Sequence, residues 1–198
     1  MSEKELLEII DYLEDKDITV NPNWYFHATN SNINTIKKIL EEGIKCSYLR
    51  GKRNSKYRFN GSYYISLGKL DKDSEEILYW LRKFPKFIIE GINPYFADKN
   101  KLKFRRMFIN TRIPLRTSER DGEYQQYLLI EPSKIKAIDF SLYNMLEDIK
   151  DKNTLKLLKN IAISTHLPIY DIFTEKEINK EKVLKLWVKK KYWMWLTT

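Results

Sequence analysis

Three short segments combine side chains that could bind a ligand and act on it. The segments are YFHAT, GSYYIS and GEYQQY, and their candidate residues are His27, Thr29, Tyr63, Tyr64, Ser66 and Glu123. Imidazole, hydroxyl and carboxylate groups can hydrogen-bond a ligand and move a proton, and a tyrosine ring can stack on a flat one. Each segment alone is unspecific, because a histidine on an aromatic strand is more often a core residue than a ligand contact. Their order along the chain carries more information.

The elements that position these residues are predicted to be the strands and helices of an α+β fold. Aromatic and β-branched residues predict strands over 23–28, 62–66, 86–92, 123–132 and 134–140. Apolar residues at helical spacing predict helices over 2–16, over about 33–42 and from Asp73 or Ser74 onward. Gly43 stands where a left-handed residue ends the second of these helices.

The end of the chain is predicted to be helical. From about residue 142 the apolar residues follow a helical spacing, with a break at His166-Leu167-Pro168. We therefore expect an α+β domain over 1–141, with an N-terminal helix. A helical C-terminal extension over 142–198 is expected to pack on the same core.

Composition and length indicate a folded globular protein of one domain with at most a small appendage. The chain has 198 residues, of which 42% are hydrophobic and 14% aromatic, and no apolar run approaches the length that spans a bilayer. The first residues, MSEKELLEII, do not resemble a secretory signal. Cys46 is the single cysteine, so neither an internal disulfide nor a structural zinc site is expected. We expect a cytoplasmic protein where it is made, and delivery to a target cell by a signal-independent route stays open.

The charge favours contact with polyanions. Lys and Arg number 36 against 27 Asp and Glu, a formal charge of +9. Such a balance suits nucleic acid, phosphorylated ligands or anionic membranes, and it equally suits a protein that stays soluble by being basic.

The order of the segments resembles the ADP-ribosyltransferase superfamily, in the branch typified by diphtheria toxin and the poly(ADP-ribose) polymerases. That family has a strand-borne histidine followed two residues later by a small or hydroxyl residue, which His27 and Thr29 match. A Gly-x-Tyr-aromatic strand follows, matched by Gly61, Tyr63 and Tyr64, and then a glutamate that opens a strand, matched by Glu123. The resemblance covers residues 22–140. It implies a split, mainly antiparallel β-sheet with flanking helices.

The resemblance also implies a reaction, in which NAD is a co-substrate and its nicotinamide–ribose bond is cleaved. The transition state is oxocarbenium-like, and the role implied for Glu123 is to stabilise its positive charge and to orient or deprotonate the acceptor. His27 would hydrogen-bond the adenosine ribose, assisted by Thr29. Tyr63 would stack on nicotinamide, or Tyr64 and Ser66 would be the inward-facing pair instead.

Two basic segments extend this comparison. Pyrophosphate contacts could come from Arg50, Lys52, Arg53 or Arg58, because guanidinium groups pair bidentately with phosphate oxygens. The segment 111–122, with Arg112, Arg116 and Arg120, precedes the glutamate where the acceptor often binds. The implied partner is a macromolecule, protein or nucleic acid, and the implied setting is a toxin, effector or defence factor. Arginine-modifying members have Glu-x-Glu where this chain has Asp121 and Glu123, which counts against an arginine acceptor.

Two other functions remain open. An RNA 2'-phosphotransferase shares a similar first motif but relies on basic residues, and Ala28 and Glu123 count against it. The second is a non-catalytic module that binds nucleic acid through its positive charge.

Overall fold

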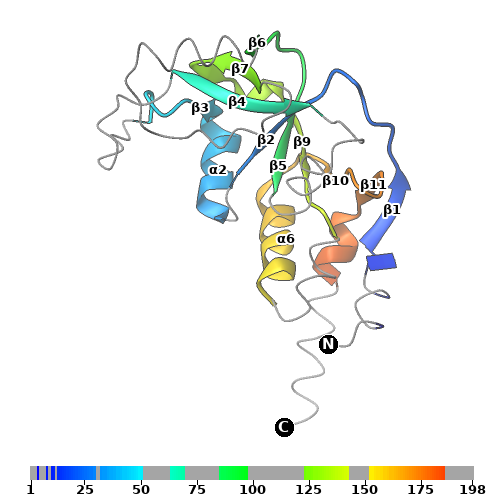
Figure 1. Cartoon of the computed structure of the whole chain (residues 1–198). Helices are drawn as coiled ribbons and strands as arrows, with labels where there is room; N and C mark the ends of the chain where they lie inside the picture. Colours follow the sequence, from blue (N-terminus) through cyan, green and yellow to red (C-terminus); the bar gives the residue numbers. More distant parts are fainter. Residues whose placement is uncertain are drawn as a thin grey trace.

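The strands of this computed structural model form one long, mainly antiparallel sheet (Figure 1). The structure describes Lys4, Glu8, 10–11, 13–29, 32–50, 63–69, 85–97, 123–142 and 152–185. The sheet within these residues has nine strands in the order β1-β11-β10-β9-β5-β2-β4-β7-β6, and β9 with β10 is its parallel pair. The predicted α+β class is confirmed.

The elements have the following bounds. The sheet contains β1 (Glu14–Asp17), β2 (Tyr25–Ala28), β4 (Tyr64–Lys69), β5 (Lys86–Ile89), β6 (Tyr95–Ala97), β7 (Glu123–Tyr127), β9 (Ile135–Asp139), β10 (Ile169–Asp171) and β11 (Lys176–Ile178). A separate two-stranded sheet pairs β3 (Ile44–Lys45) with β8 (Leu129–Ile130). The helices with complete bounds are α2 (Ile33–Glu42), α6 (Lys152–Ser164) and the short 3-10 helix η1 (Pro132–Lys134). Further described residues at 10–11, 13 and 180–185 are also helical.

The sheet changes direction between β2 and β4. These strands pair only at Tyr25 with Lys69 and at Phe26 with Gly68, and β4 then continues along β7. In Figure 1, β4 and β7 accordingly run across the top of the molecule while β5 and β9 run downward beneath them. The two halves of the sheet are thus joined by a short, strongly curved seam at the strand that carries His27.

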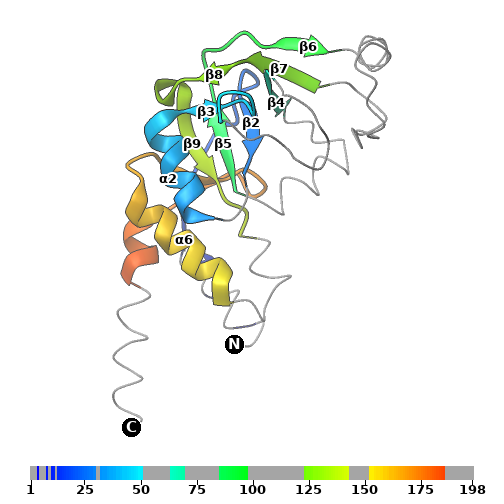
Figure 2. The same ribbon diagram turned by 90° about the vertical axis from the view of Figure 1, so that its left-hand side faces the viewer.

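The main core lies between the sheet and the helices α2 and α6. Phe87, Ile89 and Ile138 from the central strands are buried against Ile36 of α2 and Leu158 of α6. Figure 2 shows both helices on the same side of these strands. The opposite face carries a smaller buried cluster of Phe26, Ile88, Ala137 and Ile172.

Local signals place α2 where the sequence predicted it. The Asn32 side chain accepts hydrogen bonds from the backbone N–H groups of Asn34 and Thr35, at 2.9 and 3.4 Å, and so caps the helix. Gly43 ends the helix at φ +80°, and its N–H donates to the Ile39 carbonyl. A Cβ atom at Gly43 would lie 2.2 Å from the Ile130 carbonyl oxygen, so only glycine fits between α2 and β8.

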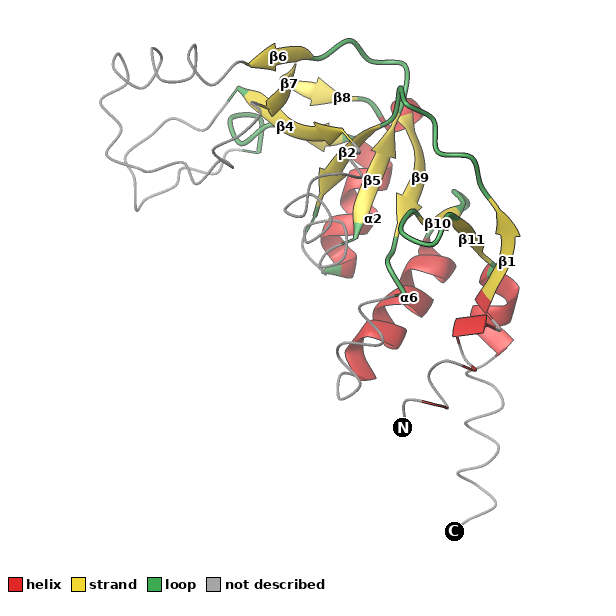
Figure 3. Ribbon diagram, turned by 45° about the vertical axis from the view of Figure 1, so that its right-hand side comes forward, coloured by secondary structure: helices red, strands yellow, loops and turns green. Residues whose placement is uncertain are grey.

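Both ends of the described chain differ from the expectation. The predicted N-terminal helix stops at Leu13, and Glu14–Asp17 is a strand. The C-terminal part is not wholly helical, because β10 and β11 follow α6 and join the sheet. Strand β1 pairs with β11, so these strands form one end of the sheet, opposite β6 (Figure 3). A sequence such as EDKD has poor strand propensity, so its conformation comes from pairing with β11.

Other predicted elements agree within a few residues, and one lies outside the description. The long strand expected over 123–132 is interrupted at Leu128, which has φ +58°. The helix expected from Asp73 or Ser74 falls outside the described residues. None of the helices that the structure describes has the length and apolar character needed to cross a membrane.

Candidate functional site

The three strands that carry the sequence segments are direct neighbours. β4 pairs with β2 on one side and with β7 on the other. β2 pairs with β4 at Gly68 and Lys69, directly after the β4 residues Tyr64–Leu67 that pair with β7. The fold therefore brings His27, Ser66 and the start of β7 to one stretch of sheet, although they are far apart in sequence.

His27 is half-buried on β2 and is oriented by β4. Its Nδ1 lies 3.0 Å from the Ser66 carbonyl oxygen. A carbonyl oxygen can only accept a hydrogen bond, so in the neutral imidazole Nδ1 carries the proton and Nε2 is an acceptor. The ring thus offers Nε2 to a hydroxyl donor.

The surroundings keep the His27 ring neutral. Burial is the largest cause that lowers its pKa below the ordinary 6.5, the bond to the Ser66 carbonyl opposes this, and the charge of Arg50 lowers it further. Arg50 is exposed in the turn after β3, and its guanidinium donates to the Ser47 hydroxyl at 3.2 Å. Among the predicted pyrophosphate contacts, Arg50 therefore lies near His27, whereas Lys52, Arg53 and Arg58 lie outside the described residues.

Thr29 follows β2 and is mostly buried, with 9% of its surface exposed. Its backbone N–H donates to the Pro85 carbonyl at 3.0 Å. This bond extends the β2–β5 pairing by one residue and holds the end of the His-x-Thr segment against β5.

The register of β4 places Tyr64 and Ser66 on the face of the sheet opposite His27. Ile65 and Leu67 point into the main core, so Tyr64 and Ser66 belong to the other face. One residue beyond the Phe26–Gly68 pair, His27 stands beside Leu67 and shares its face. Tyr63 lies in the bend before β4, and its ring stacks on that of Tyr127, which pairs with Tyr64. Both tyrosines therefore adjoin Tyr127.

Tyr63 lies among other tyrosines. Its ring centroid is 4.5 Å from that of Tyr48 and 6.3 Å from that of Tyr127, and the Tyr63 and Tyr127 planes differ by only 16°. Tyr64 meets Tyr127 edge-on, with centroids 5.6 Å apart. Tyr48 and Tyr127 were not among the predicted site residues. Period-two alternation from Glu123 would have found Tyr127, but nothing in the local sequence places Tyr48 beside Tyr63.

Glu123 is the first residue of β7. Its backbone pairs with Ala97 of β6, and its neighbour Tyr124 pairs with Leu67 of β4. The side chain of Glu123 lies outside the described part of the structure, as do residues 111–122 with Arg112, Arg116 and Arg120.

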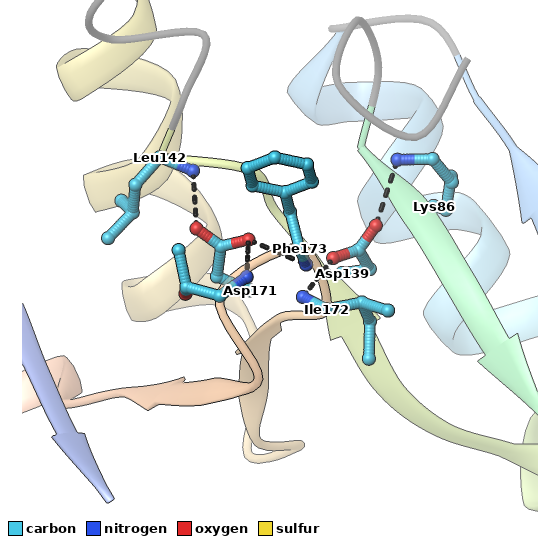
Figure 4. A network of polar contacts seen from close by, with 7 residues as sticks. Lys86, Asp139, Leu142, Asp171, Ile172 and Phe173 are labelled. Atoms are coloured by element: carbon cyan, nitrogen blue, oxygen red, sulfur yellow. Dashed lines mark hydrogen bonds and ion pairs between the residues drawn. The ribbon is translucent and has the colours of Figure 1, made fainter. Parts of the chain in front are cut away.

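A buried polar network lies beside the end of β2 (Figure 4). Lys86, which is opposite Ala28, forms an ion pair with Asp139 at 2.8 Å, and both side chains are at most 3% exposed. The other Asp139 oxygen accepts from the Ile172 N–H at 3.0 Å. The network therefore fastens β5 to β9 and to the turn after β10, and no local sequence signal connects these residues.

Asp171 continues the network on β10. Its carboxylate accepts from the backbone N–H groups of Leu142, Phe173 and Thr174 at 2.9, 3.0 and 3.4 Å. Burial raises its pKa to about 6, with a smaller contribution from Asp139, while these hydrogen bonds oppose the rise. Its contacts are with backbone of the same fold, so we interpret Asp171 as structural.

Within the described ranges, no three His, Cys, Asp or Glu side chains form a set that could hold a metal ion. The chain matches no protein-family model, no curated protein and no solved structure. Functional inference therefore depends on the geometry of β2, β4 and β7.

Proposed function

We propose that this chain is an NAD-dependent ADP-ribosyltransferase. It would cleave the nicotinamide–ribose bond of NAD and transfer ADP-ribose to a macromolecular acceptor. The observation that carries the proposal is the adjacency of β2, β4 and β7, with His27 bonded to Ser66 at the seam between them.

His27 and Arg50 would bind the adenosine side of NAD. The acceptor Nε2 of a neutral His27 suits a ribose hydroxyl, and the lowered pKa keeps this nitrogen unprotonated at neutral pH. The exposed guanidinium of Arg50, which acts electrostatically on His27, would pair with the pyrophosphate.

Tyr63 and Glu123 would act at the other end of NAD. The half-exposed ring of Tyr63 would stack on nicotinamide and so orient the glycosidic bond. When that bond breaks, its electron pair leaves with the nicotinamide nitrogen and positive charge develops on the ribose carbon. The carboxylate of Glu123 would stabilise this charge and take the proton of the acceptor as the new bond forms.

The test is nicotinamide release from labelled NAD by the full chain. We expect Glu123→Gln to lower the rate by about 100-fold or more, because loss of a group that stabilises transition-state charge costs rates of this order. The matched control is Glu131→Gln, an exposed glutamate after β8 that should retain the wild-type rate.

Equal rates for Glu123→Gln and the wild type would overturn the role of Glu123. Removal of phosphate from a 2'-phosphorylated RNA, dependent on NAD and unaffected by Glu123→Gln, would instead establish the RNA 2'-phosphotransferase alternative. Absence of NAD turnover in the wild type would refute both enzymes.

A further inference from the structure

Three exposed tyrosines form a patch where the 46–50 turn meets β4 and β7. This patch, the tyrosine shelf, consists of Tyr48, Tyr63 and Tyr127, which are 50%, 40% and 54% exposed. Neighbouring rings in the shelf have centroids 4.5 and 6.3 Å apart. Tyrosines that served only the core would be covered, so about half of each side chain remains available to a partner.

Backbone hydrogen bonds hold the shelf in place. The Leu128 N–H donates to the Tyr63 carbonyl at 2.8 Å, and the Cys46 N–H donates to the Leu128 carbonyl at 2.9 Å. The turn that carries Tyr48, the start of β4 and the end of β7 are thus linked through one residue. A backbone held in this way need not be ordered again when a ligand stacks on the rings, which lowers the entropic cost of binding.

The sequence around the shelf is strongly basic. Residues 43–69 contain seven Lys or Arg residues and no acidic residue. Three of them, Lys45, Arg50 and Lys69, belong to the described part of the structure, and Lys45 pairs with Glu42. Arg50 is exposed two residues after Tyr48. Exposed aromatic rings together with arginine and a positive charge suit unpaired bases and their phosphates, because every base has a face that can stack. A single-stranded nucleic acid accounts for both the exposed rings and the positive charge of this segment.

We propose that the tyrosine shelf binds the bases of single-stranded nucleic acid, which makes nucleic acid the acceptor class. Binding to the shelf stands independently, whereas the statement about the acceptor rests on the proposed function. Tyr63 belongs to both the shelf and the proposed nicotinamide contact. A base stacked on this shelf is therefore close to the carbon from which ADP-ribose would be transferred.

The test measures binding of labelled thymidine and uridine oligonucleotides of equal length by fluorescence anisotropy, with the full chain and without NAD. We expect Tyr127→Leu to raise the dissociation constant of both oligonucleotides by about 10-fold, since one base–aromatic stack is lost. Binding of a duplex should be unchanged, because paired bases cannot stack on the rings. If the dissociation constants of the thymidine and uridine oligonucleotides differ, the tighter one identifies DNA or RNA as the preferred nucleic acid.

The matched control is Phe173→Leu, which removes a 40% exposed aromatic ring from the turn between β10 and β11. It should leave binding within about 2-fold of the wild type. Thermal unfolding of each variant checks that it is folded, and Tyr48→Leu provides a second variant if Tyr127→Leu does not fold. Wild-type affinity in a folded shelf variant, or an equal loss of duplex binding, would overturn the inference.

This test separates the two proposals. NAD cleavage that requires Glu123, without oligonucleotide binding, would refute the shelf and leave the enzyme. Oligonucleotide binding that requires Tyr127, without nicotinamide release, would refute the enzyme and leave the shelf as a binding site. Glu123→Gln should retain oligonucleotide binding in either case.

Discussion

At the scale of single residues, the environment of His27 determines its chemistry. A buried histidine can be a protonated imidazolium, or it can be neutral with its proton on either ring nitrogen. Here the Ser66 carbonyl selects the proton on Nδ1, and burial with the nearby Arg50 charge lowers the pKa. The residue type was visible in the sequence, but the acceptor character of Nε2 follows from its neighbours.

This environment predicts how stability depends on pH. The unfolded chain protonates His27 near the ordinary 6.5 and the folded protein only at lower pH, so the unfolded state binds more protons below 6.5. The contribution of His27 to the free energy of unfolding should therefore fall as pH falls from about 7.5 to about 5.5. Urea unfolding of the wild type and His27→Gln at both values measures this change.

The quantity to compare is the difference in free energy of unfolding between the wild type and His27→Gln. Asp171 acts in the opposite direction, because the folded state binds its proton preferentially between 3.8 and about 6, and its contribution falls as pH rises. Since Asp171 is present in both proteins, its effect cancels. If the stability advantage of the wild type over His27→Gln grew as pH fell, the lowered pKa of His27 would be contradicted.

At the scale of elements, the junction between α2 and β3 sets where the 46–50 turn begins. The Asn32 cap starts the helix and Gly43 ends it at positive φ against the Ile130 carbonyl. The chain then pairs with β8 and enters the turn that carries Tyr48 and Arg50. The conformation of Gly43 thus determines where the turn with Tyr48 and Arg50 begins.

We expect Gly43→Ala to lower the free energy of unfolding by at least about 2 kcal/mol, because the added methyl group meets backbone and the φ angle is strained. The matched control is Gly68→Ala, where a Cβ would have nothing within 4 Å. That variant should remain within about 0.5 kcal/mol of the wild type. Urea unfolding measures both, and equal costs would show that the close approach at Gly43 is unimportant.

At the scale of the whole molecule, buried polar contacts join segments that are distant in sequence. Lys86 on β5 bonds Asp139 on β9, and Asp139 bonds the turn after β10. The C-terminal strands are in this way connected to the strand beside His27. The arrangement makes the end of the chain part of the fold that supports the site.

We expect Lys86→Met to cost about 3–5 kcal/mol, because it leaves the carboxylate of Asp139 buried without its cation. The control is Lys176→Met, which removes the cation from the ion pair with Asp17, a pair far more exposed than Lys86–Asp139, and should cost at most about 1 kcal/mol. Chemical unfolding near neutral pH measures both. A small cost for Lys86→Met would contradict the stabilising role of the Lys86–Asp139 ion pair.

The sequence by itself determined those elements whose signals are local. The range of α2 with its Gly43 stop, the apolar strand at Lys86–Ile89 and the strands on either side of Pro132 were all predicted to within a few residues. In each case a turn residue, a glycine or an apolar run acts over a few positions. The motif residues His27, Tyr63 and Glu123 were also visible, although their roles remain predictions.

Only the tertiary structure decided which segments meet. EDKD at Glu14–Asp17 becomes a strand because β11 supplies its hydrogen-bond partners, and no local preference of those residues would do so. The adjacency of β2, β4 and β7, the Lys86–Asp139 pair and the contact of Tyr48 with Tyr63 have the same origin. They are long-range pairings, whose free energy exists only once the sheet has formed, so no short window of sequence contains them.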